Sequence, residues 1–126
     1  MTTFKPLRFA FVLAGTVVLA LAAGPAFAHA ELLSEVPAAE SVAESPLKDL
    51  RLSFSEALNL PFCKLSLTDS TGNAITVGEL ALDAQDDKVL VAPLSDTLPA
   101  GTYKVDWTAV SNDGHKSTGT YTFKAN

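Results

Sequence analysis

Short stretches in which apolar and polar residues alternate, separated by turn residues, most constrain the fold of this chain. Such alternation is typical of strands that bury one face and expose the other. Clusters such as Asp69 to Asn73 and Leu98 to Gly101 predict turns between them. We expect about seven strands, at 31–36, 50–55, 64–68, 74–77, 88–91, 103–110 and 118–124. With turns about every 8–12 residues, this pattern predicts an all-β antiparallel sandwich or Greek-key barrel of immunoglobulin size.

Aromatic residues on the expected strands predict the core. Phe54, Trp107, Tyr121 and Phe123 lie in alternating segments, where we expect them to fill the space between two sheets. A helical period is not sustained anywhere in the body of the chain, and only residues 55–60 fit one helical turn.

The first 28 residues differ in composition from the rest. Basic residues precede an apolar run at 9–21, and Ala26-Phe27-Ala28 fits the small-residue pattern before a signal cleavage site. We interpret 1–28 as a secretory signal whose removal leaves His29 as the first residue of one exported domain, 29–126. An uncleaved anchor is the alternative, but the run is short for a bilayer span of about 20 residues. We expect the mature chain not to be embedded in a membrane.

After residue 28 the chain is strongly acidic. Seven of the nine basic residues and all 14 acidic residues lie there, which gives a formal net charge of −7. This charge argues against nucleic-acid binding and suits a protein that attracts cations. We interpret the acidic residues between Leu67 and Lys88 as a solvated segment; a secondary cation patch is the alternative.

The chain has two histidines, and both occupy positions suited to metal binding. As an N-terminal residue, His29 offers an amine and an imidazole Nδ1 that can chelate one ion together. Asp113 and His115 flank Gly114, whose backbone freedom lets a loop turn both side chains toward one point. Nitrogen and oxygen ligands in tetragonal geometry favour Cu(II). A surface histidine and an ordinary Asp-Gly-His turn form the simpler alternative. In a Greek-key sandwich the first strand can lie beside the loop before the last one.

Several segments resemble the CopC family of copper-resistance domains, over essentially the whole chain after residue 28. The segments are 29–32, 36–38, 52–56, 98–107 and 110–115. The resemblance implies a periplasmic copper carrier with an immunoglobulin-like or cupredoxin-like β-sandwich. It implies that His29 binds Cu(II) through its amine and ring, and that Asp113 and His115 complete the site. Glu56 matches a family glutamate that lies beside this site or adds a ligand. An inner-membrane transporter of the CopD type is the implied partner.

Soft sulfur ligands are scarce in this chain. Some family members carry a methionine-rich loop for Cu(I), but Met1 is the only methionine here and lies within the expected signal. We therefore expect one Cu(II) site and no methionine-based Cu(I) site. The single cysteine, Cys63, excludes an internal disulfide framework. It is far in sequence from either histidine, so we interpret it as a buried apolar residue and not a blue-copper ligand.

Two other functions stay open at this point. An N-terminal histidine with a second histidine also describes the copper centre of oxidative polysaccharide monooxygenases. Such an enzyme needs an open coordination position, which the Asp113 carboxylate would occupy, and a flat substrate surface. The other alternative is an interaction sandwich that binds no metal. We expect a carrier that is not an enzyme.

Overall fold

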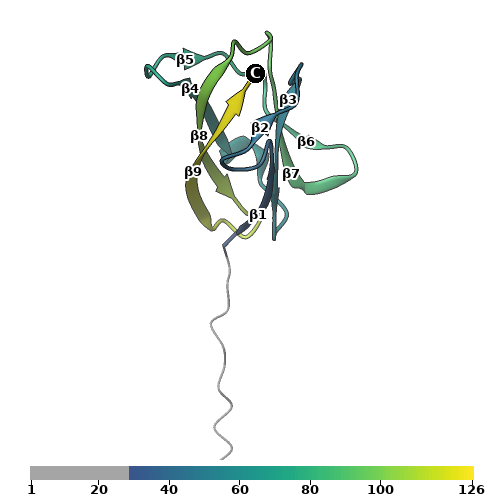
Figure 1. Cartoon of the computed structure of the whole chain (residues 1–126). Helices are drawn as coiled ribbons and strands as arrows, with labels where there is room; N and C mark the ends of the chain where they lie inside the picture. Colours follow the sequence, from purple (N-terminus) through teal and green to yellow (C-terminus); the bar gives the residue numbers. More distant parts are fainter. Residues whose placement is uncertain (1–28) are drawn as a thin grey trace, which may run out of the picture.

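The structure, a computed structural model, describes residues 29–126. Its strands are β1 (Leu32–Val36), β2 (Val42–Ala43), β3 (Asp49–Phe54), β4 (Lys64–Asp69), β5 (Ala74–Ile75), β6 (Ala81–Asp83), β7 (Asp86–Pro93), β8 (Gly101–Val110) and β9 (Lys116–Ala125). They form a four-stranded sheet, ordered β1-β3-β7-β6, and a five-stranded sheet, ordered β2-β9-β8-β4-β5. The two sheets pack against each other (Figure 1). The expected all-β sandwich is confirmed.

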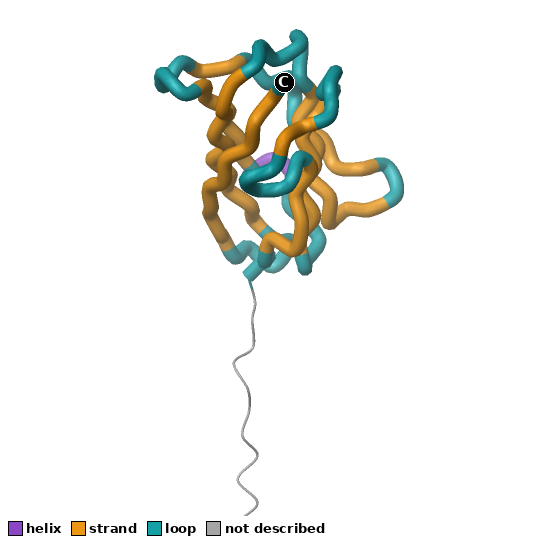
Figure 2. Tube along the Cα trace, in the orientation of Figure 1, coloured by secondary structure: helices purple, strands orange, loops and turns teal. Residues whose placement is uncertain are grey.

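The structure has more strands than the sequence predicts. The additional ones, β2 and β6, have two and three residues, too few for an alternating pattern to stand out. Within residues 29–126 the one helical turn, drawn in purple in Figure 2, covers Leu60–Phe62, later than the expected 55–60. Pro61 favours this placement, because a proline fits the first turn of a helix, where no N–H is needed.

The core lies between the sheets and follows the alternation of the strands. Every second residue of β3 is buried, ending with Phe54, and the same period runs through β8. The rings of Phe54 and Trp107 meet edge to face, with centroids 5.1 Å apart. Tyr121 and Phe123 are buried on β9, so the four predicted core aromatics are confirmed. Cys63 is also buried and free, as expected.

The β8–β9 hairpin determines where the two histidines lie. These strands pair from Gly101 opposite Ala125 to Val110 opposite Lys116, so the loop between them forms one end of the sandwich. The described chain begins at the same end, opposite the C-terminus (Figure 1). There the Ser117 hydroxyl donates a hydrogen bond of 2.6 Å to the Ala30 carbonyl. The start of the first strand therefore lies beside the loop before the last strand.

Gly119 on β9 is required for the packing of Trp107 on β8. A Cβ atom at Gly119 would lie 2.4 Å from Cζ2 of the Trp107 ring, and Trp107 is its cross-strand partner. We expect Gly119→Ala to destabilise the domain by at least ~1–3 kcal/mol, the usual cost of overpacking a core. Urea unfolding checks this, with Thr118→Ala as the control because Thr118 is exposed on the same strand. Equal stability of the glycine and alanine forms would contradict it.

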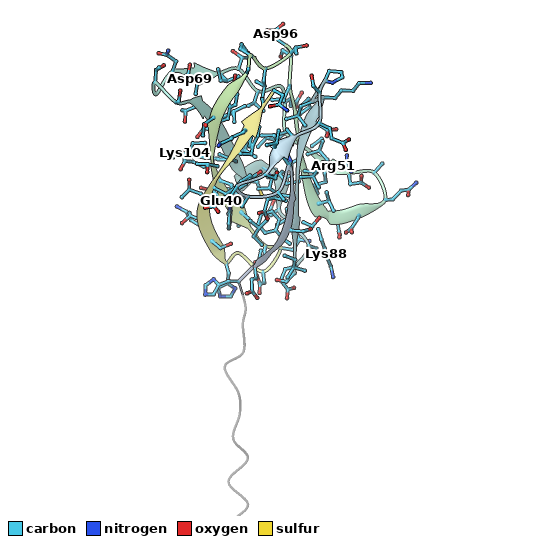
Figure 3. All side chains as sticks on the ribbon, viewed as in Figure 1. Glu40, Arg51, Asp69, Lys88, Asp96 and Lys104 are labelled. Carbon is cyan, nitrogen blue, oxygen red and sulfur yellow. The ribbon has the colours of Figure 1, made fainter. Side chains whose placement is uncertain are left out.

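Two of the acidic residues between Leu67 and Lys88, Asp69 and Asp83, bind neighbouring groups of the protein through their carboxylates. Asp69 accepts hydrogen bonds from the backbone N–H groups of Thr71 and Asn73 within its own turn. Asp83 on β6 forms an ion pair with Arg51 on β3 of the same sheet. In Figure 3, Asp69 lies at the end of the sandwich away from the start of β1. These contacts favour the solvated interpretation over a cation patch. Within the described residues no helix is long and apolar enough to cross a bilayer.

Candidate metal centre

His29 and His115 lie side by side at one end of the sandwich. Their ring centroids are 5.2 Å apart and the ring planes make an angle of 78°. Both residues are exposed, whereas Ala30, the neighbour of His29, is buried in the core. The buried Ala30 therefore anchors the backbone next to His29, and the two imidazoles face solvent. The structure brings together the two histidines that the sequence singled out.

Asp113 is held against His115 within the loop. Its Oδ2 lies 3.1 Å from Nδ1 of His115. The buried Ser111 donates a hydrogen bond from its hydroxyl to Oδ1 of Asp113. A carboxylate on Nδ1 leaves Nε2 of the ring directed outward, which is the usual way of orienting a metal-binding histidine.

The same contacts keep Asp113 ionised. The Ser111 hydroxyl, followed by the His115 ring, lowers the pKa of the Asp113 carboxyl below its usual value. A lowered pKa means that this carboxylate stabilises the fold at neutral pH, and that the contribution is lost as pH falls through the folded-state pKa. The loop is therefore organised around a negative charge.

The donor set fits one metal ion only with a contribution from the backbone. An ion bound at about 2.0 Å lies about 3 Å from an imidazole centre, so two rings on one ion have centres at most about 6 Å apart. The separation of the His29 and His115 rings is within that limit. However, among residues 29–126 no three His, Cys, Asp or Glu side chains are grouped so as to hold a metal. A free amine on His29 would supply the missing donor; in the 126-residue chain this nitrogen is bonded to Ala28.

Glu56 lies at the same end of the sandwich but does not contact the other candidates. It is exposed and follows Ser55, which hydrogen-bonds to Glu31 beside His29. Among the contacts of the described residues, none joins Glu56 to His29, Asp113 or His115. Its place beside the site stays a prediction. The signal at 1–28 and its cleavage site lie outside the described residues.

Comparison with known sequences identifies the family. The sequence model of the CopC domain matches residues 32–126, almost all of the described chain. The chain belongs to the CopC family. Copper resistance protein C of Escherichia coli is 42% identical over 118 residues, which cover 89% of this chain and 92% of that protein.

Solved structures of the family share the fold of this CopC domain. The crystal structure of PcoC, described as a methionine-rich copper resistance protein from Escherichia coli, is 40% identical with a TM-score of 0.70. The match covers 79% of this chain and all of PcoC. The structure of CopC from Methylosinus trichosporium OB3b is 26% identical with a TM-score of 0.71, over 78% of this chain and 94% of that one.

Three serines near the site of this CopC domain were not singled out by the sequence pattern. Ser111 continues the inward-facing period of β8 past its last buried alanine, and a serine at an inward position is a signal for a buried hydrogen bond. Ser55 and Ser117 carry no such signal. Each contacts backbone from the start of the chain, and only the folded topology brings these partners together.

Proposed function

We propose that the mature domain is a periplasmic copper carrier that holds one Cu(II) ion. The amine and imidazole of His29, the imidazole of His115 and the carboxylate of Asp113 form the ligand set. The similarity to copper resistance protein C of Escherichia coli, in sequence and in structure, supports the metal. The preference of Cu(II) for tetragonal nitrogen and oxygen donors supports the oxidation state.

The observation that carries this proposal is the approach of His29 to His115. The residues are 86 positions apart in sequence, yet their ring centroids lie 5.2 Å apart at an exposed end of the sandwich. An interaction sandwich without metal gives no reason for the two histidines of the chain to meet there. An ion on Nε2 of His115 and a carboxylate on Nδ1 lie on opposite sides of the ring, so Asp113 becomes a ligand only when its side chain leaves Nδ1 and turns toward the ion.

Electron paramagnetic resonance of the mature domain with one equivalent of Cu(II) tests the proposal. We expect a tetragonal spectrum with nitrogen superhyperfine structure. We also expect affinity to fall from about pH 8 to about pH 5, because an amine and imidazoles must lose protons to bind metal. A spectrum without nitrogen coupling, or an affinity unchanged over that range, would contradict the ligand set.

The chain departs from the methionine-rich relative in its sulfur ligands. No methionine follows Met1, and the single cysteine is buried in the core. We therefore propose that this carrier has no Cu(I) site built from thioethers. Transfer of its copper to an inner-membrane protein of the CopD type is part of the proposal. Competition of that purified partner for the bound copper is the measurement, and failure to remove any copper would count against transfer.

We propose a binding role and not an oxidative enzyme. As a proposed ligand, the Asp113 carboxylate would take a coordination position that oxygen chemistry needs free. The copper-loaded domain should therefore not oxidise glycans in the presence of reductant or peroxide. Clear turnover in that assay would favour the monooxygenase alternative.

A further inference from the structure

Two serines from different sheets hold the residues that directly follow His29. Ser117, on β9 of the five-stranded sheet, donates from its hydroxyl to the Ala30 carbonyl at 2.6 Å. Ser55, directly after β3 of the four-stranded sheet, accepts from the Glu31 N–H at 2.9 Å. The Ser55 N–H in turn donates to the Glu31 carbonyl at 2.9 Å. The lead-in to β1 is thus tied to both sheets.

The buried methyl group of Ala30 adds a third restraint. Ala30 is 1% exposed and belongs to the core, although it lies between the exposed residues His29 and Glu31. Pairing in β1 begins only at Leu32, opposite Phe54. Before Leu32, apart from the buried Ala30 and the Ser55 N–H bond to Glu31, the two serine hydroxyls hold these residues, and chain ends without such contacts are usually mobile.

We propose that Ser117 and Ser55 are positioning residues that place the N-terminal histidine beside His115 for metal binding. This inference rests on the proposed function and extends it. An amine and a ring on one chain end chelate copper more tightly when that chain end is already ordered. Otherwise part of the binding free energy offsets the entropy that the chain end loses on binding. Ser117 also lines a shallow hollow with His29 and Trp107, so it lies next to the proposed ligand.

Ser117→Ala should weaken Cu(II) binding by about tenfold, the order expected for loss of one hydrogen bond that supports a ligand. The nitrogen couplings in its paramagnetic resonance spectrum should become heterogeneous. Ser117→Thr retains the hydroxyl and suits a strand, so it should restore both affinity and spectrum. Thr118→Ala is the matched control, because Thr118 is the exposed next residue of β9.

A readout without copper tests the same inference. The Glu31 amide should lose hydrogen-exchange protection in Ser55→Ala, because its acceptor is the Ser55 hydroxyl. Wild-type affinity and spectrum in Ser117→Ala, together with unchanged Glu31 protection in Ser55→Ala, would overturn the proposal. If the wild-type domain itself gives no nitrogen-coupled spectrum, the proposed function fails. Loss of Glu31 protection in Ser55→Ala would then still support the holding role.

Discussion

A chain that begins at His29 should bind Cu(II) at least about 100-fold more tightly than the same chain with a methionine before His29. Loss of a contact that supports a ligand costs about 10–100-fold in metal affinity, and loss of the ligand itself should cost more. The added residue converts the amine into an amide. It removes one nitrogen donor and the chelate ring, and leaves every side chain in place. Competition with a chelator of known Cu(II) affinity measures the difference.

Quenching of tryptophan fluorescence provides a second measurement of the same comparison. Trp107 is the single tryptophan and lines the hollow beside His29. Copper at the proposed site should therefore quench it strongly in the chain that begins at His29 and only at higher copper concentration in the extended chain. Equal affinity of the two chains would exclude the amine as a ligand. Equal unfolding curves of the two metal-free chains serve as the control for the fold.

The fold could be predicted from the sequence because burial dictates alternation. In β3 and β8 each inward residue is apolar and each outward one is polar or half-buried, so the period reveals both the strand and its face. The short β2 and β6 could not be predicted in this way. Val42 and Ala43 form a parallel pair with the end of β9, and that pairing depends on a tertiary contact and not on local pattern.

The candidate site could be predicted only as a set of residue types. His29 and the Asp113–His115 loop were chosen for their ligand chemistry, and the hairpin then explains why they meet. The contacts that hold His29 and this loop in place could not be predicted from the sequence. Ser117 reaches Ala30 across 87 positions of sequence, and hydrogen bonds of such range leave no periodic trace. Ser111 also was not singled out, although its inward position could have been recognised from the period of β8.

The effects of His115→Ala and Asp113→Asn on Cu(II) binding should differ, because His115 is proposed as a nitrogen ligand and Asp113 also orients the His115 ring. His115→Ala removes an imidazole from the proposed set, so Cu(II) affinity should fall more than about 100-fold and one nitrogen coupling should disappear. Asp113→Asn retains an amide oxygen that can still accept from Nδ1 of His115. It removes the charge, so its affinity should fall about 10–100-fold with the nitrogen count unchanged.

The neighbouring Asn112 provides the control for both variants, because it is exposed in the same loop and Asn112→Ser leaves the proposed ligands intact. Its backbone N–H bonds to the Ala57 carbonyl, a contact that the substitution retains. If Asp113→Asn also loses a nitrogen coupling, the carboxylate acts mainly by holding the His115 ring. If His115→Ala keeps full affinity and all nitrogen couplings, His115 is not a ligand, and the closeness of the two rings has no role in binding copper.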